Sequence, residues 1–323
     1  MMRGLMHRLT RSSCALLLVV ATASSASAQA SPILERREVR VDGHPLSVWS
    51  KRPLTEARAS ILLVHGRTWS ARPNFDLRVP GTHVSLMDAR VARGYAVYAL
   101  DLRGYGGTPR DATGWLTPDR AEQDVSAVLD WVLARETAGN GSGVRRARPP
   151  KPALLGYSRG AQVAMLVAQR HPDKLAALVL YGYPDPGANR AAAAPDPEIP
   201  PRQRTTAQGA GEDFISPAVT PAGVKDAYVR TATTMDSIRV DWKLESQFSV
   251  LDPALVHTPT LLLDGERDPY ANASNHPAVF ARLGAADRWW VVLPGADHAA
   301  HLETQGAFVN ALVSFIERRS AVR

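Results

Sequence analysis

A serine stands between two glycines at Gly156-Tyr157-Ser158-Arg159-Gly160. The apolar run before it, "PALLGY", favours a buried strand, and "SRGAQVAMLVAQRH" after it carries apolar residues at helical spacing. A strand that turns this sharply into a helix strains the serine backbone and needs glycines two residues away on each side. Such a turn projects the serine hydroxyl above the sheet, where it can act as a nucleophile. The alternative is a tight turn without chemistry.

A serine hydroxyl is a weak nucleophile, so it needs a base, and the base needs an acid to orient it. Downstream, "LLLDGERDPYA" offers Asp264 and Asp268, and "LPGADHAAHLE" offers His298 and His301. Each stretch follows an apolar strand. Because functional side chains gather at the carboxyl ends of parallel strands, we expect both stretches on the serine's side of the sheet.

Strands that are almost entirely apolar alternate with helices along the chain, after two short strands around a turn at Asp42-Gly43. One of these helices begins after Thr117, a good N-cap, with Pro118 in its first position. The pattern predicts an α/β fold in which helices cover both faces of a mostly parallel sheet. The further expected strands are "ASILLVHG", residues 95–100, "LAALVLYGY", "TPTLLLDG" and "RWWVVLPG".

Residues 184–252 interrupt this alternation. A stretch rich in proline and alanine, "PDPGANRAAAAPDPEIPPRQRT", is followed by weakly helical patterns in "PAGVKDAYVRTA" and "DWKLESQF". An unstructured loop of this length is uncommon in a compact domain. We therefore expect residues 184–252 to form a lid inserted into a catalytic domain that spans residues 31–323.

Residues 1–30 have the features of a secretory signal peptide. A basic start without acids precedes the apolar run "CALLLVVATA", and the small residues that follow allow cleavage after Ala28 or Ala30. The run of about ten apolar residues is shorter than the roughly 20 that a spanning helix needs. We therefore expect a periplasmic or secreted protein without stable membrane insertion. The single cysteine, Cys14, falls within the leader, so a mature chain would have no thiol nucleophile and no disulfide.

The composition argues against several other function classes. Hydrophobic residues make up 45% of the chain and charged residues 21%, as in ordinary globular proteins. The basic run at 143–152 lacks aromatic residues for base stacking, so we expect no nucleic-acid partner. The glycine-rich "DLRGYGG" lacks the G-K-[ST] ending of a phosphate-binding loop. No metal-ligand set is evident either, and we expect neither a cofactor nor a metal.

Taken together, these motifs resemble the α/β-hydrolase family from about residue 33 to the C-terminus. The resemblance is carried by "VHG" at 64–66, "DLRGYGGT" at 101–108, G-x-x-D ending at Asp268 and G-x-x-H ending at His298, with Glu303 five residues later. It implies that each motif lies in a loop at the end of a strand of the sheet.

The resemblance also implies a role for each site residue. Ser158 would be the nucleophile, His298 the base that later protonates the leaving group, and Asp268 the acid that orients the histidine. The backbone N–H groups of Arg67 and Arg159 would form the oxyanion hole. Family spacing favours Asp268 as the acid.

Several nearby residues remain alternatives or are expected to be structural. Asp264 and Asp185 are other possible positions for the acid. We expect His301 to line a helix, His65 to support the oxyanion loop and Arg103 to brace the loops around the site.

Serine as the nucleophile points to acyl transfer, whereas aspartate or cysteine would suggest other chemistries of this fold. The first hypothesis is a secreted hydrolase that cleaves a small-molecule or polymeric carboxylic ester through an acyl-enzyme. The alternative is an aminopeptidase or amidase, in which lid acids at 196, 198, 212 and 213 would hold the substrate's amino group. A third hypothesis is a non-catalytic relative that acts as a binding protein.

Overall fold

The computed structural model describes residues 32–139, 150–184, 197–271, 274 and 276–320. The predicted signal peptide, Cys14 and Asp185 lie outside the described residues, as do most of the basic run at 143–152 and the acid at 196.

The strands form one eight-stranded sheet in the order β1-β2-β4-β3-β6-β7-β9-β10. β2 pairs antiparallel with β1 and β4, and all other neighbours in the sheet run parallel. This topology confirms the predicted mostly parallel sheet. The strands are β1 (Glu35–Val41), β2 (His44–Lys51), β3 (Ala59–Val64), β4 (Tyr95–Asp101), β6 (Ala153–Tyr157), β7 (Ala177–Tyr181), β9 (Thr260–Gly265) and β10 (Arg288–Leu293).

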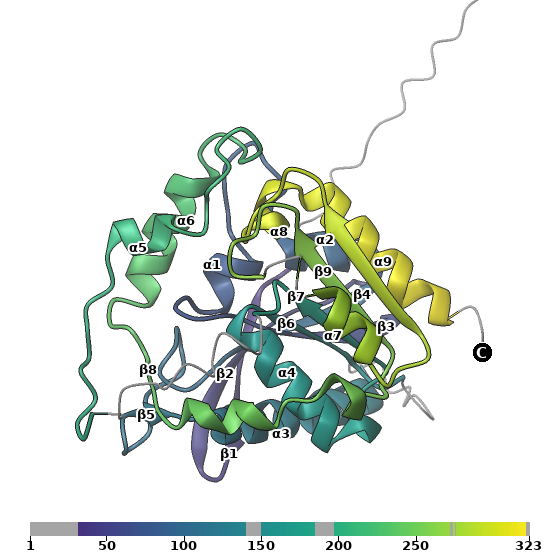
Figure 1. The fold of residues 1–323 in the computed structure, drawn as a ribbon, viewed down its shortest axis with the longest axis horizontal. Helices are drawn as coiled ribbons and strands as arrows, with labels where there is room; N and C mark the ends of the chain where they lie inside the picture. The colour runs from purple at the N-terminus through teal and green to yellow at the C-terminus, as the bar shows by residue number, and fades with distance from the viewer. Residues whose placement is uncertain (1–31, 140–149, 185–196, 272–273, 275, 321–323) are drawn as a thin grey trace, which may run out of the picture. The chain divides into compact units, whose positions relative to one another are not determined.

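Helices cover both faces of this sheet (Figure 1). Successive side chains of a strand point to opposite faces, so Leu62 and Val64 of β3 belong to one apolar cluster and Ile61 and Leu63 to the other. This two-sided burial explains why the central strands are apolar throughout. The first cluster is completed by α3 (Pro118–Ala138), α4 (Arg159–Arg170) and α7 (His276–Arg282), the second by α1 (Ala71–Phe75), α2 (Leu86–Val91), α8 (Ala300–Glu303) and α9 (Gln305–Ser320).

Two local predictions are confirmed by backbone geometry. Asp42 and Gly43, with φ values of 50° and 77°, form the turn between β1 and β2. Thr117 caps α3, because its hydroxyl accepts a hydrogen bond from the N–H of Arg120 at 3.2 Å.

Residues 197–252, which together with residue 184 are the described part of the predicted lid, lie between β7 and β9 and are called the inserted segment below. The segment contains α5 (Ala207–Gly211), α6 (Val224–Met235), β8 (Asp241–Trp242) and the 3-10 turn η3 (Glu245–Val250). Side chains of α6 share a third apolar cluster with Trp69 and Leu302. Figure 1 shows α6 beside α1. Short 3-10 turns also occur at η1 (Pro172–Lys174) and η4 (Pro253–Leu255).

The helical pattern predicted for "DWKLESQF" is wrong. Its first two residues form β8, which pairs with β5 (Trp115–Leu116) in a small parallel sheet. Leu244 then adopts a left-handed conformation with φ of 56°, which a helix cannot continue through. The residues that follow form only a 3-10 turn.

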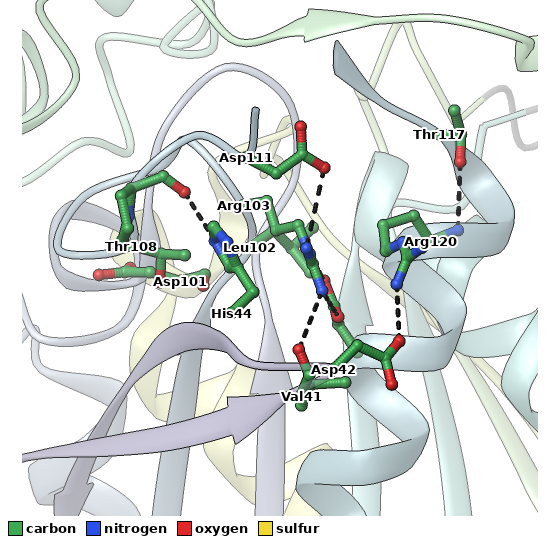
Figure 2. A network of polar contacts seen from close by, with 12 residues as sticks. Val41, Asp42, His44, Asp101, Leu102, Arg103, Thr108, Asp111, Thr117 and Arg120 are labelled. Carbon is green, nitrogen blue, oxygen red and sulfur yellow. Dashed lines mark hydrogen bonds and ion pairs between the residues drawn. The ribbon is translucent and has the colours of Figure 1, made fainter. Parts of the chain in front are cut away.

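Arg103 joins three parts of the fold, as the sequence suggested for a bracing residue. Its Nε and Nη2 donate to the two carboxylate oxygens of Asp124 in α3, at 2.7 and 2.8 Å. Figure 2 shows the same guanidinium between Asp111 and the carbonyl of Val41, at 3.7 and 3.5 Å. The loop after β4 is thereby held against both α3 and the end of β1.

Replacing Arg103 by methionine should lower the free energy of unfolding by about 3–5 kcal/mol, because the buried carboxylate of Asp124 loses its partner. Arg120 offers a matched control, since its ion pair with Asp42 at 2.9 Å is largely exposed. Arg120→Met should lower the free energy of unfolding by less than about 1 kcal/mol. Urea unfolding followed by circular dichroism measures this free energy for both variants, and similar losses in the two would contradict the bracing role of Arg103.

Candidate active site

Ser158 lies on the turn between β6 and α4, with φ of 54° and ψ of −122°. A side chain on this backbone is strained, and such strain persists only where the surroundings impose it. Two close backbone approaches impose it here. A Cβ atom at Gly156 would lie 2.2 Å from the carbonyl oxygen of Gly160, and one at Gly160 would lie 2.4 Å from that of His65. Both flanking positions therefore require glycine.

The two residues predicted as acid and base form a buried pair. Nδ1 of His298, in the loop after β10, lies 2.7 Å from Oδ2 of Asp268, in the loop after β9. The other carboxylate oxygen of Asp268 accepts hydrogen bonds from the N–H groups of Tyr270 and Ala271 at 2.9 and 3.0 Å. With Nδ1 facing the acid, Nε2 is the nitrogen that can accept a proton.

This pair packs against the strand ends next to Ser158. The rings of His298 and Tyr157 have centroids 4.9 Å apart. Gly182, just after β7, approaches so closely that a Cβ atom there would lie 3.1 Å from Cε1 of His298. The N–H of Ser158 donates to the carbonyl of Tyr181 at 2.8 Å. The carboxyl ends of β6, β7, β9 and β10 thus bring Ser158, Asp268 and His298 to the same end of the sheet.

The loop after β3 also reaches Ser158. A Cβ atom at Gly66 would lie 2.8 Å from that of Ser158, so Arg67 begins directly beside the serine. Arg159 is the first residue of α4, where backbone N–H groups have no partner within the helix. These positions suit two N–H groups that face an oxyanion.

His65 holds the loop that carries Gly66. Its Nε2 accepts from the N–H of Leu102 at 3.1 Å, which leaves Nδ1 to donate to the carbonyl of Gly66 at 2.8 Å. Burial lowers the pKa of His65 to about 4, although the hydrogen bond to Gly66 opposes this. The imidazole therefore stays neutral near pH 7 and acts as a fixed connector between two loops.

The charges around His298 favour its protonated form. Burial alone would lower the pKa of His298, but the carboxylate of Asp268 and its hydrogen bond, followed by the charges of Asp213 and Asp297, raise this pKa above its ordinary value. Burial opposes ionisation of Asp268 too, and the charge of His298 overcomes this and lowers the pKa of Asp268. Asp213, from the inserted segment, was one of the lid acids noted in the sequence.

The competing candidates have other partners. Asp264 accepts from Nδ1 of His276 at 2.6 Å and from Nε1 of Trp290 at 3.0 Å, so its carboxylate serves a second buried pair. His301 lies on α8 with Nδ1 2.9 Å from the hydroxyl of Tyr181. Burial lowers the pKa of His301 to about 3, so this imidazole is neutral near pH 7.

Asp297, the residue before His298, anchors the inserted segment. Its Oδ2 accepts from the N–H groups of Ile215 and Ser216, both at 2.6 Å. Oε2 of Glu303 in turn accepts from the N–H of Asp297 at 2.9 Å. Burial, together with a hydrogen bond to the Asp297 carboxylate, raises the pKa of Glu303 to about 8. Glu303 is therefore a neutral acid near pH 7 that supports the histidine loop.

Sequence reasoning did not identify Gly182 or Glu245. Gly182 has φ of 55°, and its signal was a glycine immediately after an apolar strand. Glu245, in η3, forms ion pairs with the side chains of both Arg67 and Arg159. No local pattern marks Glu245, because its partners are distant in the sequence.

Within the described ranges, no group of three or more histidine, cysteine, aspartate or glutamate residues could hold a metal ion. Over the same residues, no helix has the length and apolar character needed to cross a bilayer.

Comparison with known proteins places the chain among hydrolases. A model of the alpha/beta hydrolase family matches residues 61–312. The sn-1-specific diacylglycerol lipase ABHD11 of Mus musculus is 25% identical over 276 residues, which cover 80% of each chain.

Solved structures show the same fold. A hydrolase from Pseudomonas aeruginosa superposes with a TM-score of 0.61 at 20% identity, covering 87% of this chain and 98% of its own. A thermophilic esterase superposes with a TM-score of 0.57 at 20% identity, covering 89% of this chain and 99% of its own. Together with the family model, these matches confirm the predicted α/β-hydrolase fold.

The neutral state of Glu303 makes stability depend on pH. In the unfolded chain Glu303 ionises near its ordinary pKa of 4.5, whereas the folded protein keeps the proton up to about pH 8. Between these values the unfolded state binds fewer protons, so stability falls as pH rises. Between pH 5 and 9, the free energy of unfolding of Glu303→Gln should therefore fall by roughly 2–4 kcal/mol less than that of the wild type.

Chemical denaturation across that pH range measures the effect. Glu317→Gln is the matched control, because its carboxyl reaches solvent at the surface of α9. Its pH profile should follow that of the wild type. A Glu303→Gln profile as steep as the wild-type profile would show that Glu303 does not hold this proton.

Proposed function

The chain belongs to the alpha/beta hydrolase family, and we propose that it is a serine hydrolase that cleaves a carboxylic ester through an acyl-enzyme. The observation that carries the proposal is a strained serine at the sheet edge where a buried Asp268–His298 pair lies. An oriented histidine beside a half-buried serine on a tight turn is the arrangement that nucleophilic acyl transfer needs.

The proposed reaction has two halves. Oγ of Ser158 attacks the ester carbonyl while Nε2 of His298 takes the hydroxyl proton, and Asp268 stabilises the resulting cation. The N–H groups of Arg67 and Arg159 hold the oxyanion, and each such donor typically lowers the barrier by about 3 kcal/mol. The alcohol then leaves with the proton from His298. Water, activated by the same imidazole, releases the acid and restores Ser158.

Three further features fit this proposal. A curated relative is named a diacylglycerol lipase, which favours an ester as the substrate class. The inserted segment, tied to the histidine loop through Asp297, would serve as a lid over the strand ends. The leader pattern in residues 1–30 supports export to the periplasm or the medium.

Asp213 is the one observation that favours the second candidate, an aminopeptidase or amidase. Burial raises the pKa of its carboxyl, while the positive charge of His298 lowers it. A partly buried carboxylate of the inserted segment in the field of the base is a suitable partner for a substrate ammonium group. The ester remains the first choice because the relative's name points to it.

Ser158→Ala should reduce kcat for p-nitrophenyl acetate by a factor of about 10⁴–10⁶ while the fold persists, because the nucleophile is lost. A fluorophosphonate probe should label the wild type at residue 158 and leave the variant unlabelled. Turnover close to that of the wild type, or a wild type that stays unlabelled as a binding protein would, contradicts the assignment.

The two histidines provide an internal comparison for the same assay. His298→Ala should lose nearly as much activity as Ser158→Ala, because no other group then accepts the serine proton. His301→Ala should lose far less, since its imidazole contacts Tyr181 rather than the reacting atoms. Equal losses would mean that the base has been misidentified.

Asp213→Asn should move the acid limb of kcat/KM for p-nitrophenyl acetate to lower pH. The charge of Asp213 helps to raise the pKa of His298, and the reaction needs the neutral imidazole. Glu212→Gln, at the exposed neighbouring position, should leave the acid limb in place. If the aminopeptidase hypothesis holds instead, Asp213→Asn should mainly raise KM for aminoacyl p-nitroanilides.

A further inference from the structure

One carboxylate is shared between the side chains of the two residues proposed to form the oxyanion hole. Nη1 of Arg67 lies 2.9 Å from Oε1 of Glu245, and Nη2 of Arg159 lies 2.7 Å from Oε2. Arg67 follows Gly66 and Arg159 follows Ser158, so both guanidinium groups belong to residues that border the reacting position. Their side chains extend to the inserted segment, which contributes Glu245 from η3.

Positive charge exceeds negative charge in this cluster. Burial lowers the pKa of Arg159, and the neighbouring cation of Arg67 lowers it further while Glu245 only partly compensates. Arg239, also from the inserted segment, has a pKa lowered by burial and then by Arg67. Asp241 lies near Arg239 but already pairs with Arg110 at 3.2 Å. Two guanidinium groups therefore share the single carboxylate of Glu245, and the charge of Arg239 acts on the same group of side chains.

The same cluster contains buried hydrogen-bond donors without acceptors among the described residues. They are Nε of Arg67, Nε of Arg239 and Nε2 of Gln162. The Oε1 atom of Gln162 is occupied, because it accepts from Nη1 of Arg159 at 2.8 Å. Buried donors usually have partners, so several unpaired donors in one cluster call for an acceptor.

Glu245 is placed where it can be displaced. Its side chain is 30% exposed, and those of Arg67 and Arg159 are 27% and 15% exposed. It is the first residue of a short 3-10 turn that follows the left-handed Leu244. A carboxylate held at the edge of solvent by two arginines can exchange with another carboxylate, because guanidinium groups match that geometry in either case.

We propose that Arg67, Arg159 and Arg239 form a subsite for a carboxylate carried by the substrate, and that Glu245 occupies this subsite in the free enzyme. The inference rests on the proposed function and narrows it to esters with a free carboxylate near the scissile carbonyl, such as half-esters of dicarboxylic acids. Binding of the substrate carboxylate releases Glu245 and, with it, one tether of the inserted segment.

The test compares mono-4-nitrophenyl adipate with its neutral methyl ester. The two compounds differ only in the methyl group that replaces the negative charge of the free carboxylate. Arg239→Gln should lower the ratio of kcat/KM for the charged over the neutral ester by about tenfold, since a charge-assisted contact is lost. Glu245→Gln should raise that ratio by about 3–10-fold through a lower KM for the charged ester, because the competing carboxylate is gone.

Arg204→Gln is the matched control, because Arg204 is exposed in the same inserted segment and should leave the ratio unchanged. A ratio that is the same in the wild type, Arg239→Gln and Glu245→Gln overturns the subsite, as does an equal loss with both esters.

If the wild type cleaves neither ester, the proposed function fails, and the subsite is then judged by calorimetric titration of adipate. Binding that is about tenfold weaker in Arg239→Gln than in the wild type supports it, and absent or equal binding overturns it.

Discussion

Three stretches of backbone meet around Ser158 more closely than side chains would allow, and the rest of the site depends on that contact. Gly156, Gly160 and Gly66 each face a neighbour at a distance where a Cβ atom would collide. The contact fixes the strained φ of the serine and brings the loop after β3 beside it. The same approach places the start of α4 and Arg67 next to the hydroxyl. A larger side chain at any of these glycines would separate the nucleophile from both proposed oxyanion donors.

Around this fixed point the charges are divided between two sides. Carboxyl groups gather on the histidine side, where Asp268 and Asp213 raise the pKa of His298 against the effect of burial. Guanidinium groups gather on the side of the proposed oxyanion hole, where Arg67 and Arg159 share Glu245. In the proposed reaction the base would thereby be more basic, and the developing negative charge would lie close to these cations. The effect on the histidine side is strengthened because His298 and Asp268 are buried, and buried charges interact more strongly than charges in water.

The parts of the fold and of the candidate site that could be predicted from the sequence are those marked by a local sequence pattern. The turn at Ser158 and the apolar strands carry their own patterns, so the α/β fold and the strand-end loops were predictable. The choice between Asp264 and Asp268 rested on resemblance alone, and the structure gives Asp264 a different partner, His276. Glu245 had no signal, because its ion pair with Arg67 joins residues 178 positions apart. The helix expected for "DWKLESQF" was wrong for a related reason, since pairing with β5 outweighed a weak local preference.

The inserted segment contacts the site through polar bonds at two separate places, and this arrangement has a physical consequence. Apolar packing in the third cluster fixes α6 against the catalytic domain irrespective of charge. The links nearest the reacting groups are instead carboxylate contacts, Asp297 with Ile215 and Ser216 on one side and Glu245 with two arginines on the other. Polar links of this kind exchange with ligand groups or change with protonation far more readily than packed apolar side chains do. The segment can therefore stay attached through its apolar face while its edges respond to the charge of the substrate.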